Sequence, residues 1–310
     1  MRVLFWGTPE FATPPLRALL GEGFDVVGVV TQPDKAVGRS RSVLQPPPVK
    51  RVALEESLPV LQPERPRGDE FLAQVRALAP DVSVVVAYGH LLPRAVIDLP
   101  PRGTLNIHAS LLPALRGAAP IQAAIREGLP HTGVTIMRMV EKLDAGPIIL
   151  QLGMPIHDDE TYGELALRLS ELGAAAIVEA LALLELGRAQ EETQDESRAT
   201  YAGKFDRDAT LVDWTQDARV VARTVRAYDP RPGAFTALAG QDVKLFGARL
   251  APRPDSAESG SVLGVDDEGL VVACGTGAVR IAQVQPTGKK RVAAIEWHRG
   301  RGVSVGQRFG

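Results

Sequence analysis

Over the first 150 residues, β-branched runs alternate with segments of helical pattern, and this alternation limits the folds that are open to the chain. Strands are predicted at residues 3–6, 26–30, 82–87, 104–108 and 133–139, and helices at residues 11–20, 72–78 and 120–127. Continuous apolar runs separated by helices are typical of a parallel sheet that helices cover on both faces. The sequence therefore predicts an α/β domain with a Rossmann-like parallel sheet, whose ligands bind at the carboxyl ends of the strands.

A change of composition divides the chain after this region. Residues 161–186 have the pattern of a long amphipathic helix, with a break expected near Gly173, and residues 187–207 turn polar. Beyond them, a helix is predicted at 217–228, followed by short strand-like segments at the roughly 8–12-residue spacing of a small barrel. We therefore predict a first domain over residues 1–189, a linker over 190–207 and a smaller β-barrel domain over 208–310.

Charge and composition narrow the function classes. Residues 208–310 carry 14 Lys and Arg against 11 Asp and Glu, so any anionic partner is expected on the second domain; a chance asymmetry of charge is the alternative. The longest apolar run, residues 84–88, is far short of the ~20 residues that cross a bilayer. The opening residues hold no signal-peptide apolar region, and the single Cys274 cannot form an internal disulfide. We expect a soluble, cytoplasmic protein without membrane association. The histidines lack metal-ligand spacing, so no metal site is predicted.

The predicted strand at 104–108 places two polar side chains on one face. Asn106 and His108 alternate with Leu105 and Ile107, which are expected to point into the core. Burying an unpaired polar group costs about 1–3 kcal/mol, so the pair is expected at the carboxyl end of the strand, in the ligand crevice. A structural histidine that caps a loop is the alternative.

Asp144 follows the next predicted strand, in a loop that contains Gly146, and is expected at the same end of the sheet. Asparagine, histidine and aspartate can together run acyl transfer from an amide donor to an amine. The asparagine donates to the developing oxyanion, the histidine donates or moves protons, and the aspartate fixes the imidazole and takes the amine's proton. An ordinary loop aspartate is the alternative.

The motifs around these residues resemble those of the folate-dependent formyltransferases. Residues 106–113 (NIHASLLP) and 116–122 (RGAAPIQ) are similar to the family signature, and residues 143–146 (LDAG) to the segment with its catalytic aspartate. The resemblance covers nearly the whole chain, because it extends to further segments at residues 5–12 (FWGTPEFA), 31–34 (TQPD), 84–89 (VVVAYG), 200–202 (TYA) and 285–290 (QPTGKK).

The resemblance implies transfer of the formyl group of 10-formyltetrahydrofolate to the α-amino group of methionine on initiator tRNA, for translation initiation. Asn106, His108 and Asp144 would be the catalytic residues, without a metal. The second domain would be an OB-like β-barrel that binds the tRNA, and no obligate protein partner is expected. The folate site would be lined by Ser110, Leu111, Leu112, Pro113, Val86, Tyr88 and Val140.

Two groups of cations are candidate tRNA contacts. Lys35, Arg39 and Arg41 lie in a loop over residues 32–49 that shows no clear secondary structure, and a loop of that length is usually functional or disordered. Lys289 and Lys290 lie in a late turn of the second domain. Cations without a nearby run of carboxylates suit phosphate contact, and solvated surface charge is the alternative.

Three other functions compete with this interpretation. A nucleotide-dependent dehydrogenase is disfavoured because Gly7 supplies only the first glycine of G-x-G-x-x-G. A formyltransferase for a small amine, such as a purine-pathway or amino-sugar acceptor, would share the catalytic residues without needing the cations. A non-catalytic RNA-binding protein would have no use for Asn106, His108 and Asp144.

Overall fold

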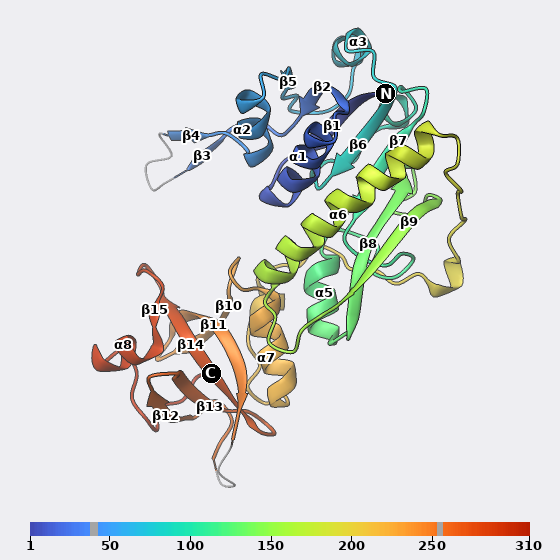
Figure 1. Ribbon diagram of the computed structural model, residues 1–310. Helices are drawn as coiled ribbons and strands as arrows, with labels where there is room; N and C mark the ends of the chain where they lie inside the picture. Colours follow the sequence, from blue (N-terminus) through green and yellow to red (C-terminus); the bar gives the residue numbers. More distant parts are fainter. Residues whose placement is uncertain (38–42, 253–256) are drawn as a thin grey trace. The chain divides into compact units, whose positions relative to one another are not determined.

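The computed structural model describes all of the chain except residues 38–42 and 253–256 (Figure 1). The chain divides into two compact units. The first unit contains residues 1–117, 132–154 and 166–201, and the second contains residues 118–131, 155–165 and 202–310. The predicted domains are continuous in sequence, whereas the two observed units are not. α5 (Pro120–Glu127) and the start of α6 (Tyr162–Glu185) lie within the predicted first domain but belong to the second unit.

The first unit is built on a seven-stranded sheet with the strand order β5-β2-β1-β6-β7-β8-β9. Parallel pairing joins β5 through β7, as the apolar runs predict. The mixed α/β class with a Rossmann-like sheet is therefore confirmed. The strands are β1 (Arg2–Gly7), β2 (Asp25–Val30), β5 (Val60–Leu61), β6 (Val82–Val86), β7 (Thr104–His108), β8 (His131–Arg138) and β9 (Ile148–Pro155).

The expectation that the strand after β7 is also parallel is wrong. β8 pairs antiparallel with β7, with Leu105 opposite Arg138 and His108 opposite Thr135. A parallel connection needs a crossover helix that packs on the sheet. The helix after β7 is α5, which belongs to the second unit, so the chain re-enters the sheet at the same end at which β7 leaves it and runs back antiparallel.

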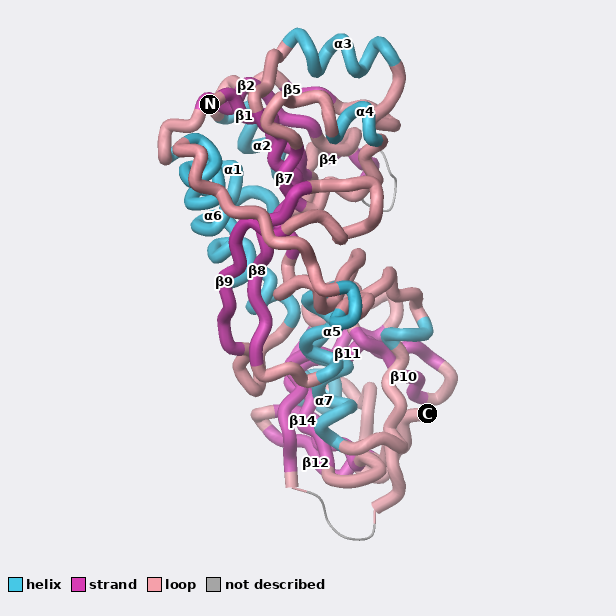
Figure 2. The backbone as a smooth tube through the Cα atoms, turned by 90° about the vertical axis from the view of Figure 1, so that its right-hand side faces the viewer, coloured by secondary structure: helices cyan, strands magenta, loops and turns pink. Residues whose placement is uncertain are grey.

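Helices cover both faces of the first unit's sheet (Figure 2). On one face, α3 (Asp69–Ala77) and α4 (Arg94–Ile97) pack their apolar side chains against Leu4 and Trp6 of β1. On the other face lie α1 (Thr13–Gly21), preceded by η1 (Glu10–Ala12), and α6.

Two local predictions need correction. α6 runs unbroken through Gly173, where a Cβ atom would come 3.0 Å from Ile107, so this glycine allows close helix–sheet packing rather than a break. The segment 32–49 contains regular secondary structure: β3 (Lys35–Val37) pairs with β4 (Val43–Gln45), and α2 (Pro48–Glu55) begins within it.

The second unit is an antiparallel β-sheet with the strand order β10-β11-β14-β13-β12, to which β15 adds by pairing with β14. Its strands are β10 (Ala234–Leu238), β11 (Gln241–Ala251), β12 (Val262–Asp266), β13 (Gly269–Ala273), β14 (Ala278–Pro286) and β15 (Val292–Ala293). Short helical segments complete the description: α7 (Ala218–Ala227), α8 (Ala294–Arg299) and η3 (Asp208–Thr210) in this unit, and η2 (Glu196–Arg198) in the first.

The last residues of the chain join the two outer strands of this sheet. The Phe309 N–H donates to the carbonyl of Gly260, just before β12, and the Gly310 N–H donates to the carbonyl of Ala237 in β10. Phe309 is buried and stacks against Trp214 and Trp297. The prediction of a small β domain is confirmed, and its edges are linked in the manner of an OB-like barrel.

None of the helices described over residues 1–37, 43–252 and 257–310 is long and apolar enough to cross a membrane.

Candidate active site

Strand register puts Asn106 and His108 on the same face of the sheet. Asn106 lies beside Val85, which in turn lies beside Trp6, so the asparagine shares the face of α3 and α4. Leu105 lies beside Val84 and is fully buried on the opposite face. Asn106 is partly exposed, and none of the described residues forms a hydrogen bond with its side chain. Its amide is therefore free to donate to a ligand.

A backbone carbonyl fixes the tautomer of His108. The His108 Nε2 atom lies 2.9 Å from the carbonyl oxygen of Leu115. Because a carbonyl only accepts hydrogen bonds, Nε2 carries the hydrogen, and in the neutral ring Nδ1 is the acceptor. Nδ1 lies 3.7 Å from Oδ2 of Asp144, too far for a hydrogen bond but close enough for an ion pair once the ring is protonated. Both side chains are well buried, with exposed fractions of 6% and 13%.

Asp144 reaches His108 by a route that differs from the expected one. Because β8 is antiparallel, it ends beside Thr104, at the far end of β7, where the Met139 N–H donates to the Thr104 carbonyl. The loop over 139–147 then returns toward His108. Asp144 has a left-handed backbone (φ +49°), and its Oδ2 accepts a 2.8 Å hydrogen bond from the Gly117 N–H. The structure thus brings the predicted histidine and aspartate together.

The segment 110–113 forms a turn that several hydrogen bonds hold in place. The Ser110 hydroxyl donates to the Ala114 carbonyl at 2.6 Å, so it is engaged within the turn. Thr135 of β8 donates to the Ser110 carbonyl and accepts from the Leu112 N–H. A cis peptide joins Leu112 to Pro113. Ser110 and Leu112 are buried, and Leu111 and Pro113 are partly exposed.

The other predicted folate residues differ in environment. Val86 is fully buried at the end of β6, and Val140 is exposed at the start of the loop after β8. The Tyr88 ring packs against Trp6 in the core, where burial raises the pKa of its phenol to about 12. Its hydroxyl is buried without a hydrogen-bond partner among the described residues. Within the described residues, Tyr88 forms side-chain contacts through its backbone carbonyl, which accepts hydrogen bonds from the side chains of Thr8 and Gln32.

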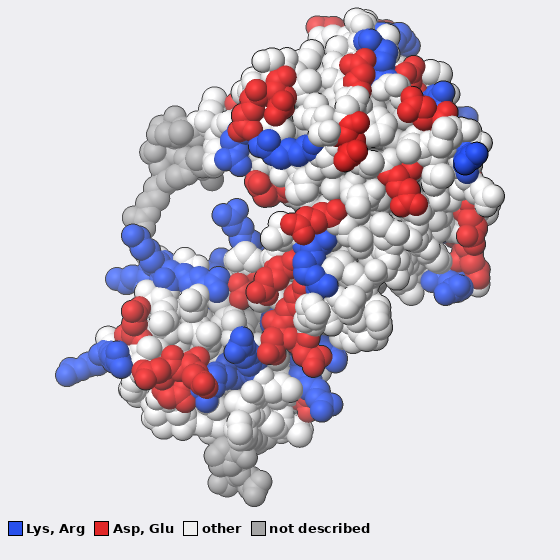
Figure 3. Space-filling model, in the orientation of Figure 1, with Lys and Arg blue, Asp and Glu red and all other residues white. Residues whose placement is uncertain are grey.

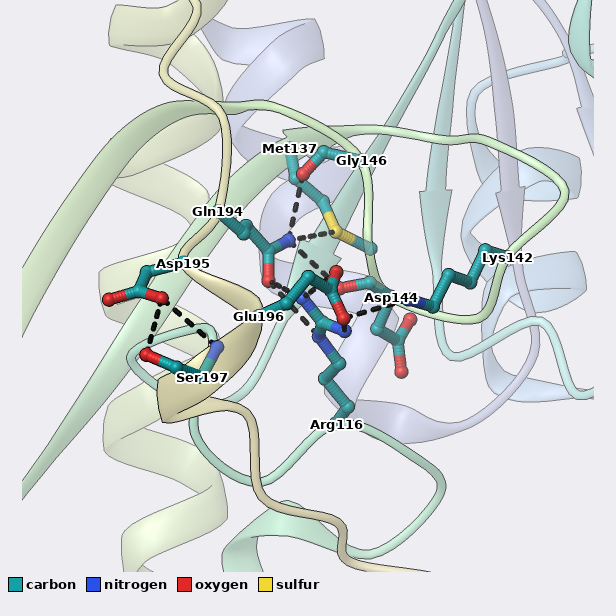
Figure 4. A network of polar contacts seen from close by, with 9 residues as sticks. All are labelled: Arg116, Met137, Lys142, Asp144, Gly146, Gln194, Asp195, Glu196 and Ser197. Atoms are coloured by element: carbon teal, nitrogen blue, oxygen red, sulfur yellow. Dashed lines mark hydrogen bonds and ion pairs between the residues drawn. The ribbon is translucent and has the colours of Figure 1, made fainter.

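A polar network that the sequence did not reveal surrounds Asp144 (Figure 4). The fully buried guanidinium of Arg116 donates to the Gln194 amide oxygen and to both carboxylate oxygens of Glu196. The Gln194 amide nitrogen donates to the carbonyls of Asp144 and Gly146. The hydrogen bonds from Arg116 and then Lys142 lower the pKa of Glu196 to about 2. The sequence predicts a linker here because polar composition carries no signal that Gln194 is buried.

The structure describes three of the five residues that are predicted to contact tRNA. Arg39 and Arg41 lie outside the described residues, and Lys35 is exposed at the start of β3. Lys289 and Lys290 are exposed in the turn between β14 and β15, and neither forms an ion pair within the part of the chain that is described. Figure 3 shows a row of lysine and arginine side chains along the end of the second unit where β15 lies.

Across the described part of the chain, no group of three or more His, Cys, Asp or Glu side chains is placed to hold a metal ion.

Comparison with known proteins decides the family. The model described as formyl transferase matches residues 1–181, and the model of the formyl transferase C-terminal domain matches residues 204–302. The chain belongs to the formyl transferase family. The first match holds Asn106, His108 and Asp144, and the second holds Lys289 and Lys290.

Full-length relatives share about half of the sequence. The methionyl-tRNA formyltransferase of Aromatoleum aromaticum is 50% identical over 309 residues, covering 100% of this chain and 97% of that protein. The methionyl-tRNA formyltransferase of Bacillus subtilis is 43% identical over 310 residues, covering 100% and 98%.

Known structures with more distant sequences share the fold. A HypX variant from Aquifex aeolicus is 22% identical with a TM-score of 0.71; the match covers 98% of this chain and 48% of HypX, so the chain spans about half of that protein. The sugar 3N-formyl transferase WlaRD is 16% identical with a TM-score of 0.67, and the match covers 94% and 99%. This family uses a folate-derived formyl donor, and HypX has been crystallised with tetrahydrofolic acid.

Proposed function

We propose that this protein transfers the formyl group of 10-formyltetrahydrofolate to the α-amino group of methionine on initiator tRNA, in the cytoplasm, for translation initiation. The observation that carries the proposal is the 43–50% identity, over the full chain, to proteins named methionyl-tRNA formyltransferase. The pairing of His108 with Asp144 beside Asn106 supports acyl transfer at this site.

The donor fits the polar groups that the site leaves open. The Asn106 amide, without a partner among the described residues, can donate to the oxygen of a formamide. Folate contacts are proposed for the turn over 110–113 and for the segments that contain Val86, Tyr88 and Val140. The hydroxyl of Ser110 is engaged with Ala114, so this residue contributes shape and backbone groups rather than a free hydroxyl.

The protein's part in the reaction is to stabilise charge and move a proton. The amine attacks the formyl carbon, and Asn106 donates to the oxyanion that develops. The Nδ1 lone pair of His108 accepts the surplus ammonium proton, because Nε2 already carries a hydrogen held by Leu115. The imidazolium then forms an ion pair with Asp144. When the tetrahedral intermediate collapses, the bond between the formyl carbon and N10 breaks, a proton is delivered to N10, and tetrahydrofolate leaves.

We further propose that the second domain, residues 208–310, binds the tRNA, with residues 190–207 as the linker from the catalytic domain over 1–189. Lys289 and Lys290 are proposed as phosphate contacts because they are exposed and lack ion-pair partners among the described residues. Lys35, Arg39 and Arg41 are proposed as further phosphate contacts of the tRNA.

A small amine is the less favoured acceptor. The sugar N-formyltransferases that share this fold are only 15–18% identical to the chain, a level that supports the fold alone. No observation in the structure favours such a substrate.

The test is a formyl-transfer assay with the purified full-length protein and 10-formyltetrahydrofolate. Methionyl initiator tRNA, methionyl elongator tRNA and small amines are offered separately, and the formylated product is measured. Efficient formylation of the initiator tRNA is expected. Formylation of a small amine with equal or greater kcat/KM would overturn the proposed acceptor, and no transfer to any amine would overturn the proposed reaction.

A further inference from the structure

The segment over residues 190–201 contains a buried amide that touches the loop of Asp144. We infer that Gln194 is a positioning residue that holds Asp144 in place for the reaction, and that Arg116 in turn fixes the orientation of Gln194. This inference rests on the catalytic role proposed for Asp144.

The Gln194 side chain uses both ends of its amide. Its nitrogen donates to the Asp144 carbonyl at 2.9 Å and to the Gly146 carbonyl at 2.7 Å. Its oxygen accepts from Nη2 and Nε of Arg116 at 2.7 and 3.1 Å. Only 6% of Gln194 is exposed, so water does not compete freely for these groups.

Arg116 decides which way the amide faces. A guanidinium has donors only, so the amide oxygen of Gln194 must point to it and the amide nitrogen must point to the loop. The other edge of Arg116 donates to both carboxylate oxygens of Glu196, which holds the guanidinium in one orientation. The buried arginine therefore works as a fixed support behind the glutamine.

The two carbonyls that Gln194 holds lie on either side of Ala145. Asp144 has a backbone φ of +49°, a conformation that residues with a Cβ atom rarely adopt without local support. Holding both carbonyls fixes the direction in which the Asp144 side chain leaves the loop. Its carboxylate then meets the Gly117 N–H at 2.8 Å and faces Nδ1 of His108 at 3.7 Å. A shift of the loop by about 1 Å would misplace this carboxylate, which can cost about 100-fold in rate.

The experiment compares variants of the full-length protein by steady-state kinetics with both substrates. Gln194→Met keeps the volume and removes every hydrogen bond. We expect kcat to fall about 10- to 100-fold, with KM for the donor and for methionyl-tRNA changed less than about threefold, and with an altered pH profile of kcat. Ser197→Ala is the matched control, because it removes a hydrogen bond to Asp195 in the same segment without touching the Asp144 loop. We expect its kcat to stay within twofold.

Gln194→Glu supplies a second test if the methionine variant does not fold. A carboxylate in this place still accepts hydrogen bonds from Arg116 but cannot donate to the carbonyls of the Asp144 loop. We therefore expect kcat to fall by a similar factor while the protein stays folded. An unchanged kcat in the folded variants, or a rise in KM alone, would overturn the inference.

Asp144→Asn, measured in parallel, separates this inference from the proposed function. If Asp144→Asn keeps its activity, the catalytic role of Asp144 is wrong. If Asp144→Asn loses activity and Gln194→Met does not, only the positioning role is wrong.

Discussion

At the scale of the residue, the site is set by which atoms already have partners. His108 donates through Nε2 to the Leu115 carbonyl, so only Nδ1 is left to take a proton. Asp144 is held by the Gly117 N–H on the same oxygen that faces the imidazole. Asn106 has no partner among the described residues, which suits a donor that acts on the substrate.

The first prediction concerns Asn106. Asn106→Ala removes a hydrogen-bond donor aimed at the developing oxyanion, and such a loss typically lowers kcat about 10²–10³-fold. The formyl-transfer assay measures the effect, and an unchanged melting temperature would show that the fold is intact. Activity within a few-fold of the parent would contradict the oxyanion role.

The second prediction concerns pH and Glu196. Its pKa is lowered from 4.5 to about 2 in the folded protein, chiefly by the hydrogen bonds from Arg116. Between these pH values the unfolded chain binds the extra proton, so the free energy of unfolding should rise with pH over this window. The contribution is complete above about pH 4.5 and is lost as the pH falls toward 2.

Denaturant unfolding of the parent and of Glu196→Gln at pH 3 and pH 6 tests this linkage. The variant should show the smaller difference in stability between the two pH values. Equal differences would mean that the Arg116–Glu196 contact does not contribute.

At the scale of the element, the antiparallel β8 decides how Asp144 arrives. β8 ends beside the amino end of β7, whereas His108 lies at the carboxyl end. The loop over 139–147 must therefore turn back toward His108 within a narrow space. Gly146 makes this turn possible: a Cβ atom there would lie 1.8 Å from the Arg138 carbonyl oxygen. Backbone cannot give way as a flexible side chain does.

Gly146→Ala should therefore move the loop and reduce kcat, with a loss of stability of about 1–3 kcal/mol from overpacking. Gly21→Ala is the matched control, because nothing lies within 4 Å of the new methyl group at the end of α1. Formyl transfer and denaturant unfolding report the two effects. Parental activity and stability in Gly146→Ala would show that the turn has room to relax.

At the scale of the whole molecule, each unit has its own core. Trp6 lies in the core of the first unit, under α3 and α4. In the second unit, Phe309 stacks with Trp214 at a ring distance of 5.6 Å, close to the chain end that links β10 with β12. The link between the two outer strands of this small sheet thus depends on the hydrogen bonds and ring contacts of Phe309 and Gly310.

Phe309→Ala should destabilise the second unit by about 3–5 kcal/mol, as expected for removing a buried aromatic ring. Denaturant unfolding should show an earlier transition of the second unit, with the transition of the first unit unchanged. Leu250→Ala provides a control for a side chain on the surface of the same unit, where 56% is exposed. A shift of both transitions together would show that the two units unfold as one.

Local patterns along the chain are enough to predict the class of the fold and much of the site. Apolar runs predict the parallel strands because a strand buried on both faces must be apolar, and the alternation in residues 104–108 placed Asn106 and His108 on one face. The motifs around them indicated the family, which the comparisons confirm. The catalytic and binding roles of individual residues stay predictions.

The direction of β8, the path of the Asp144 loop and the burial of Gln194 and Arg116 depend on contacts between residues far apart in the chain. Strand direction depends on where the preceding helix packs, and that is a long-range property which no local pattern encodes. The polar stretch of residues 190–201 resembles any solvated linker, because hydrogen bonds to distant partners leave no mark on composition. Gln194 of this stretch is buried for a physical reason that appears only in three dimensions: its amide pairs with Arg116 and with the Asp144 loop.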